Sequence, residues 1–227
     1  MEQSQSLTGR QAKDALYEQF ARLAKAVAHP GRIEVLELLA QGERSVDAVA
    51  VATGMGVTNT SAQLQVLRRA RLVESRKDGT RVLYRLAGDD VAAFLAALRT
   101  VARSRLAEVD RVVRDYFEAR DALEPVTRAE LAERLRHGDV VVLDVRPPEE
   151  YAAGHIPGAL SAPLDELDAV AARLPKRRQV VAYCRGPYCV LAPEAVDRLR
   201  QAGFRARRLE DGMPEWRLAG FPVDVAG

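Results

Sequence analysis

A short apolar run that leads directly into a cysteine, with a helix beginning six residues later, is the feature that most constrains this fold. Residues 180–183 read Val-Val-Ala-Tyr, Cys184 follows at once, and a helical pattern begins around Val190. A second apolar run occupies residues 140–143. Uninterrupted apolar strands of this kind are typical of parallel sheets that are buried on both faces. The pattern therefore predicts an α/β domain with a parallel sheet in this half of the chain.

Cys184 is predicted to be reactive because of where it lies. Loop amides and the N-terminal end of the following helix direct N–H groups and a positive dipole toward its thiol. Both favour the thiolate over the thiol, and the thiolate is the nucleophile. The same donors would hold an anionic group on the sulfur that is attacked.

The length of the chain, its N-terminal residues and its two cysteines indicate the number of domains and the cellular compartment. A chain of 227 residues is long enough for two domains of roughly 100 residues. Residues 1–10 are polar and show no export signal, and no apolar run reaches the roughly 20 residues of a membrane span. We therefore expect a cytoplasmic protein that does not enter the membrane, in which the cysteines are reactive rather than structural.

The first half of the chain shows the pattern of a helix-turn-helix followed by a hairpin. Ser45 is a candidate N-cap for a short helix that ends at Gly54, and residues 57–70 form a second helix with a polar outer face. Two strand-like runs over residues 72–86 flank Asp78-Gly79, a strong hairpin signal. The candidate DNA-binding residues lie on the second helix and the hairpin: Thr58, Asn59, Thr60, Gln63, Gln65, Arg68, Lys77 and Arg81.

The distribution of charged residues is consistent with DNA binding by the first half but does not establish it. The first 120 residues carry 19 lysines and arginines against 15 acids, whereas residues 121–227 carry 15 against 17. Seven of the basic residues fall between Arg68 and Arg85, where only Glu74 and Asp78 are acidic. Such a cluster is expected on a surface that faces phosphates. A solvated charged face is the alternative interpretation.

Residues 15–86 resemble the ArsR/SmtB family of winged-helix repressors, from Ala28-His-Pro-Gly-Arg-Ile, through Leu67-Arg-Arg-Ala-Arg-Leu-Val, to the hairpin. The resemblance implies a mainly α winged helix-turn-helix that binds a double-stranded DNA operator as a homodimer. A long apolar stripe over residues 89–116 fits the last helix of that dimer, and a monomer is the alternative. The family usually has glycine where Arg71 stands, and a left-handed backbone there would cost a non-glycine residue roughly 1 kcal/mol.

Metal sensing is not expected of this half. Many family members bind metals through a Cys-x-Cys pair before the recognition helix, or through His and Asp on the last helix. Here the first of these helices lacks cysteine, the last lacks histidine, and His29 stands alone beside Pro30. Soft metal ions need thiolate and imidazole ligands, so we expect neither a metal nor a cofactor.

The second half resembles a single-domain rhodanese. The resemblance is carried by residues 143–159, by Tyr183-Cys-Arg-Gly-Pro-Tyr-Cys189, and by Glu210-Asp-Gly-Met-Pro-Glu-Trp216. The loop from Cys184 to Cys189 has six residues, the length of sulfurtransferases, and lacks the closing arginine of the longer phosphatase and arsenate reductase loops. The resemblance implies that Cys184 takes sulfane sulfur from a donor as a persulfide and passes it to a thiol acceptor. The remaining active-site loop residues would be Arg185, Gly186, Pro187 and Tyr188.

The sequence leaves two interpretations open for each of two residues in this loop. Arg185 either attracts an anionic donor or faces solvent. Cys189 stands where the family often has Arg, Ser or Thr. Either it attacks the persulfide and forms a disulfide or polysulfide bridge, or it is a thiol that never reacts.

The sequence thus predicts two domains joined by a linker. An ArsR-type DNA-binding and dimerisation domain spans residues 1–118, the linker spans 119–126, and a rhodanese-like domain spans 127–227. The favoured function is a transcriptional regulator, a repressor, coupled to a domain that loads sulfane sulfur on Cys184. The alternative is primarily a thiosulfate or polysulfide sulfurtransferase whose winged helix serves for dimerisation or targeting. An arsenite or other thiophile effector at the two cysteines also stays open.

Overall fold

The computed structural model describes residues 8–118 and 125–226 and divides the chain into two compact units. The first unit contains residues 1–39 and 43–88, and the second contains residues 40–42 and 89–227. The division therefore falls after Gly88, so the long helix that follows belongs to the second unit. The predicted domain boundary at residue 118 stays a prediction. No helix in the described ranges is long and apolar enough to cross a bilayer.

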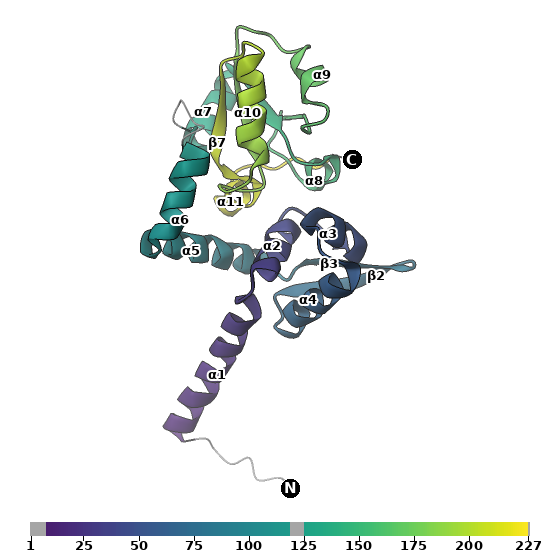
Figure 1. The fold of residues 1–227 in the computed structure, drawn as a ribbon, viewed down its shortest axis with the longest axis vertical. Coiled ribbons are helices and arrows are strands. Elements are labelled where there is room, and N and C mark those ends of the chain that lie inside the picture. Colours follow the sequence, from purple (N-terminus) through teal and green to yellow (C-terminus); the bar gives the residue numbers. More distant parts are fainter. Residues whose placement is uncertain (1–7, 119–124, 227) are drawn as a thin grey trace. The chain divides into compact units, whose positions relative to one another are not determined.

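The first unit is a winged helix-turn-helix (Figure 1). Its order is α1 (Gly9–Val27), α2 (Pro30–Leu39), β1 (Arg44–Ser45), α3 (Val46–Thr53), α4 (Val57–Arg69), β2 (Val73–Asp78) and β3 (Arg81–Leu86). The three strands form an antiparallel sheet in the order β1-β3-β2. Fully buried Leu36, Val49, Leu64 and Leu67 join α2, α3 and α4 in one core. The mainly α fold predicted for this half is confirmed.

Local signals set the ends of these elements as predicted. The Ser45 hydroxyl accepts a hydrogen bond from the Ala48 amide and caps α3, which ends at left-handed Gly54. Asp78 pairs with Arg81 across the turn of the β2–β3 hairpin, where Gly79 has φ 59°. One expectation for α4 was wrong: Thr60, predicted to lie on the polar outer face, is buried. The helix turns Thr60 inward, where its hydroxyl donates to the Gly56 carbonyl.

Arg71, at the position where the family usually has glycine, has a left-handed backbone with φ 61°. It follows the C-cap of α4, where the Arg71 amide donates to the Arg68 carbonyl and the Leu72 amide to the Leu67 carbonyl. These two hydrogen bonds form a Schellman motif, which favours glycine at the position of Arg71.

Replacing this arginine should therefore stabilise the first unit. We expect Arg71→Gly to raise its free energy of unfolding by about 0.5–1 kcal/mol, because glycine has no Cβ to strain the left-handed backbone. Denaturation followed by far-UV circular dichroism measures the change. Trp216 is the single tryptophan and lies in the second unit. Its fluorescence should therefore report an unchanged unfolding transition of that unit. A lower stability of the first unit would contradict the prediction.

The second unit begins with a helix that is interrupted. The sequence predicts one continuous helix over residues 89–116, but the structure has α5 (Asp89–Arg105), α6 (Ala107–Val112) and a π-helical segment η1 (Val113–Glu118). Leu106 breaks the helix with φ −111° and ψ 106°. The break turns the chain so that Val113 and Phe117 become buried. No proline or glycine marks this break in the sequence.

The rest of the second unit is an α/β domain around a parallel sheet (Figure 1). Its strands are β4 (Val140–Asp144), β5 (Leu160–Ser161), β6 (Gln179–Cys184) and β7 (Ala206–Gly212), in the order β5-β4-β6-β7, and all three pairings are parallel. The helices are α7 (Arg128–His137), α8 (Pro148–Ala153), α9 (Leu167–Ala171), α10 (Leu191–Gln201) and α11 (Met213–Leu218). This confirms the predicted α/β fold with a parallel sheet.

Side chains of β6 alternate between the two faces of the sheet. Val180, Ala182 and Cys184 pack into one core with α9 and α10, and Val181 and Tyr183 pack into the other with α7 and α11. Trp216 is buried in the second core. Because both faces are covered, the strand is apolar throughout, and Cys184 ends it on the side of α10.

Candidate functional site

The loop between β6 and α10 holds both cysteines of the chain. Cys184 is the last residue of β6, and Cys189 lies two residues before the start of α10. The structure joins them in a disulfide with a Cα–Cα distance of 6.2 Å. The two sulfurs are therefore within bonding reach, which the sequence had left open. Cys184 is buried, whereas Cys189 is partly exposed.

A close approach of β7 holds the loop in place. A Cβ atom added to Gly212 would lie 2.2 Å from the Gly186 nitrogen and 2.3 Å from the Arg185 carbonyl carbon. Only glycine fits there without moving the loop. The Cys189 amide also donates to the Gly186 carbonyl at 3.1 Å and closes a turn within the loop. Sequence reasoning did not single out Gly212, although it lies in the Glu210–Trp216 segment that carried the resemblance.

Neither interpretation of Arg185, attraction of an anionic donor or exposure to solvent, describes its environment fully. Its side chain is 28% exposed, and its Nε and Nη2 donate to the carboxylate of Glu150 at 2.7–3.0 Å. Glu150 belongs to α8 and is itself 1% exposed. The positive charge of Arg185 is thus matched by a buried carboxylate, so it offers little net attraction to an anionic donor. The sequence analysis did not identify Glu150 as its partner.

A buried polar network lies under the loop, next to β4 and β6. Arg146 and Asp144 form a fully buried ion pair, and Arg146 also donates to the Gly154 carbonyl at 2.7 Å. The Tyr183 hydroxyl donates to Asp144 at 2.6 Å and accepts from the Ile156 amide. Burial and the nearby Asp144 charge raise the pKa of Tyr183, which keeps the phenol protonated as a donor. These residues position the strands, so Asp144 and Arg146 serve as scaffold.

The histidine near this network is also structural. His155 is buried, its ring stacks on Tyr151 with centroids 3.8 Å apart, and its Nδ1 lies 2.9 Å from the Tyr151 carbonyl. In the described ranges no cluster of three or more His, Cys, Asp or Glu side chains could hold a metal ion.

The predicted DNA-binding residues fall into two groups. Thr58, Asn59, Arg68, Lys77 and Arg81 are exposed on α4 and the hairpin. Gln63 and Gln65 are partly buried and have partners: Gln63 bonds Asn59 and Arg32, and the Gln65 amide donates to the buried Tyr84 hydroxyl at 3.1 Å. Thr60 lies on the buried side of α4 with Leu64 and Leu67.

The basic cluster is partly neutralised. Arg76 pairs with Glu43 and Arg85 pairs with Glu74. Lys77 and Arg81 lie at opposite sides of the hairpin turn and have no ion pair with any described residue. Charge at the hairpin tip is therefore available to an anionic partner.

Comparison with known proteins gives the family. Residues 29–75 match the profile of the bacterial regulatory protein arsR family, and residues 127–219 match the rhodanese-like domain. The chain is 52% identical over 212 residues to the HTH-type transcriptional regulator Rv0324 of Mycobacterium tuberculosis, covering 93% of each protein. The chain belongs to the ArsR family. It is an ArsR-family transcriptional regulator with a C-terminal rhodanese-like domain.

Two further relatives match one half of this ArsR-family regulator each. A sulfurtransferase of Allochromatium vinosum is 36% identical over 86 residues, which cover 37% of this chain and 78% of the relative. A solved homodimeric winged helix-turn-helix DNA-binding domain from Mycobacterium bovis is 50% identical, covers 44% of this chain and 92% of its own, and has a TM-score of 0.41.

Proposed function

We propose that this ArsR-family regulator is a cytoplasmic, homodimeric DNA-binding repressor that takes sulfane sulfur onto Cys184 as a persulfide. Attack by Cys189 on this persulfide then releases hydrosulfide and leaves the Cys184–Cys189 disulfide. The change in the loop then alters the affinity of the dimer for its operator. The disulfide itself is the observation that carries this proposal. A sulfurtransferase that only passes sulfur on needs one cysteine, whereas a second thiol within bonding reach supplies a switch.

The sulfur chemistry has two steps. The Cys184 thiolate attacks the outer sulfur of a persulfide or polysulfide donor, a bond forms between the two sulfurs, and the donor thiolate leaves. The Cys189 thiolate then attacks the Cys184 sulfur, the disulfide forms, and hydrosulfide leaves. The two cysteines together lose two electrons, and the sulfane sulfur gains them as sulfide.

The loop geometry supports the first of these steps. Cys184 ends β6, and the loop leads directly to α10, an 11-residue helix whose N-terminal end favours a thiolate nearby. In the disulfide form the partly exposed Cys189 is the more accessible residue of the pair. A reducing thiol would attack it there and release Cys184 for another cycle.

DNA binding is assigned to the exposed residues of α4 and the hairpin. Thr58 and Asn59 lie in the first turn of α4 and would reach base edges in the major groove, and Arg68 would meet the backbone. Lys77 and Arg81 at the hairpin tip would meet phosphates or the minor groove. Thr60 is buried and supports α4, whereas Gln63 and Gln65 form hydrogen bonds with other side chains of the first unit.

Dimerisation is supported by the first helix. Leu16, Tyr17, Phe20 and Leu23 of α1 are 37–63% exposed in the single chain. These side chains recur at three- and four-residue spacing, so they form one apolar face. A second copy of the chain would cover it, as the family resemblance implies.

The link between sulfur and DNA is tested by measuring operator affinity in both redox states. A duplex is selected from a random-sequence library, and the full chain is titrated onto it in the dithiol and disulfide forms at several salt concentrations. We expect affinities that differ by roughly 5- to 150-fold, the range of ordinary allosteric coupling. A Cys184→Ser, Cys189→Ser variant should show the same affinity under reducing and oxidising conditions. Equal wild-type affinities at every salt concentration would refute the link.

A further inference from the structure

The turns that lead into β6 and β7 concentrate positive charge at one edge of the parallel sheet. Residues 173–178 read Arg-Leu-Pro-Lys-Arg-Arg, so four of these six residues are cations and none is acidic. Arg205 comes directly before β7. These exposed cations are together called the basic edge, which comprises Arg173, Lys176, Arg177, Arg178 and Arg205.

Packing holds the two turns side by side. The Lys176 ammonium donates to the Ala202 carbonyl and lies 3.6 Å from the centroid of the Phe204 ring. The Val180 amide donates to the Arg205 carbonyl at 2.9 Å, which places Arg205 beside the start of β6. Cations from two separate parts of the sequence therefore share one surface.

The four arginines of the basic edge are not neutralised by their surroundings. They form neither an ion pair nor a side-chain hydrogen bond with any residue in the described ranges. Asp139 lies close to the start of β6, because the next residue, Val140, pairs with Gln179. This carboxylate, however, forms an ion pair with Arg134 at 3.4 Å. Like charges that share a surface repel one another, so a partner of opposite charge would stabilise it.

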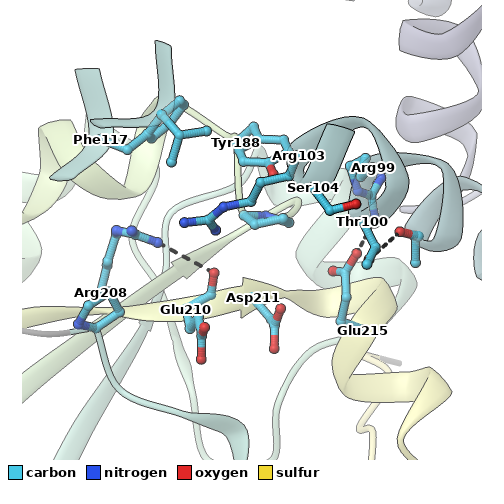
Figure 2. A pocket seen from close by; sticks show the side chains of 14 residues that line it. Arg99, Thr100, Arg103, Ser104, Phe117, Tyr188, Arg208, Glu210, Asp211 and Glu215 are labelled. Atoms are coloured by element: carbon cyan, nitrogen blue, oxygen red, sulfur yellow. Dashed lines mark hydrogen bonds and ion pairs between the residues drawn. The ribbon is translucent and has the colours of Figure 1, made fainter. Parts of the chain in front are cut away.

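Arginines elsewhere in the second unit do have partners. A cavity of about 780 Å³ lies beside the loop between β6 and α10, and Figure 2 shows how two arginines of its lining are held. Arg99 forms an ion pair with buried Glu215, and Arg208 donates to the Glu210 carbonyl at 3.4 Å. Residues 121–227 as a whole carry 17 acids against 15 lysines and arginines. The excess of cations at the basic edge is therefore local and does not follow from the composition of this half.

The basic edge is also remote from the sulfur chemistry. All strands of the sheet run in the same direction, and Cys184 is the last residue of β6. The basic edge lies before Gln179, the first residue of this strand. At about 3.3 Å per residue, the six residues of β6 separate the two ends by roughly 17 Å. A small sulfur anion at Cys184 would therefore lie beyond direct contact with these cations.

We infer that the basic edge binds the phosphate backbone of duplex DNA, as a second contact besides the one assigned to α4 and the hairpin. Exposed arginines spread over two turns suit a polyanion with repeated charges better than a single small anion. Duplex DNA is the polyanion favoured here, because the chain belongs to a family of transcriptional regulators. Once the first unit is bound, the second meets the same duplex at a high effective concentration, so weak contacts are enough. The inference rests on the proposed DNA binding of the first unit.

Titration at several salt concentrations tests this contact. The full chain is titrated onto the selected duplex as wild type and as an Arg177→Gln, Arg205→Gln variant, which removes one charge from each turn. We expect the plot of log affinity against log salt to become shallower by about 2 per chain, and the affinity to fall about tenfold or more.

The matched control is an Arg136→Gln, Arg198→Gln variant. It removes the same net charge from the same unit, but these arginines are ion-paired with Glu133 and Asp168. The slope should stay at the wild-type value. Denaturation followed by Trp216 fluorescence verifies that the second unit of each variant is folded.

A second duplex distinguishes a phosphate contact from an indirect effect on base recognition. Phosphates carry no sequence information, so Arg177→Gln, Arg205→Gln should weaken binding equally on the selected duplex and on an unrelated one. Asn59→Ala should instead weaken binding to the selected duplex alone, because Asn59 is assigned to base edges.

The possible outcomes separate this inference from the proposed function. If wild type prefers the selected duplex and both double variants have the same slope, the inference is wrong while the proposed function stands. If wild type binds every duplex equally, the proposed function fails, and the slopes of the two variants still decide whether the basic edge contacts phosphates. A chain that binds no duplex overturns both. Binding to phosphatidylglycerol vesicles that Arg177→Gln, Arg205→Gln abolishes, with unchanged DNA binding, would assign the surface to anionic lipid and overturn the inference.

Discussion

Cys184→Ser should abolish sulfur uptake by the reduced chain. Cys189→Ser should take up sulfur and keep it as a persulfide on Cys184. With tetrasulfide as donor, intact mass is expected to show the wild type losing two hydrogens as the disulfide forms. Cys189→Ser should gain the mass of one or more sulfur atoms, because no second thiol removes the persulfide. Cys184→Ser should react slower by on the order of 10³-fold or more, because a serine hydroxyl is not ionised at neutral pH.

The pair of variants also assigns the order of the two steps. Only two cysteines are present, so each variant leaves one thiol. If Cys184→Ser gains stable sulfur and Cys189→Ser does not, Cys189 is the acceptor and the assignment is reversed. Should neither variant nor the wild type change mass, the loop does not take sulfane sulfur, and a thiophile such as arsenite becomes the effector to test.

Gly212→Ala should displace the loop between β6 and α10. The added methyl group would meet the main chain of Arg185 and Gly186 at 2.2–2.3 Å, and main-chain atoms cannot rotate away as a flexible side chain does. Overpacking of this kind costs about 1–3 kcal/mol of the free energy of unfolding. Because the loop carries Cys184, sulfur uptake should fall as well. Trp216 fluorescence during denaturation follows the second unit directly, since this tryptophan is buried there.

Gly186→Ala is the matched control on the other side of the same contact. A Cβ added there would lie 3.9 Å from its nearest neighbour, the Glu215 carboxylate, which is an ordinary contact distance. We expect a change within about 0.5 kcal/mol and sulfur uptake close to wild type. Equal stability and uptake in Gly212→Ala and the wild type would show that the loop does not depend on this contact.

Local patterns in the sequence were enough to predict most of the elements and the position of the loop that carries both cysteines. The apolar runs at residues 140–143 and 180–183 became β4 and β6 of a parallel sheet, because a strand covered on both faces is apolar throughout. Asp78-Gly79 marked the hairpin, and Arg71, where the family usually has glycine, took a left-handed conformation. Each of these depends on backbone preferences or burial within a few residues, which a sequence displays directly.

Contacts between distant segments were decided only by the tertiary structure. Whether Cys189 reaches Cys184 depends on the path of the loop, and that path is limited by Gly212 on a neighbouring strand, 26 residues after Gly186. Arg185 has its charge matched by Glu150 from α8, and Thr60 turns inward, although both look available in the sequence. The break at Leu106 has no local signal, yet Val113 and Phe117 beyond it line the cavity beside the loop. Local periodicity specifies which face of an element is apolar, whereas the partner of that face is set by packing across the whole unit.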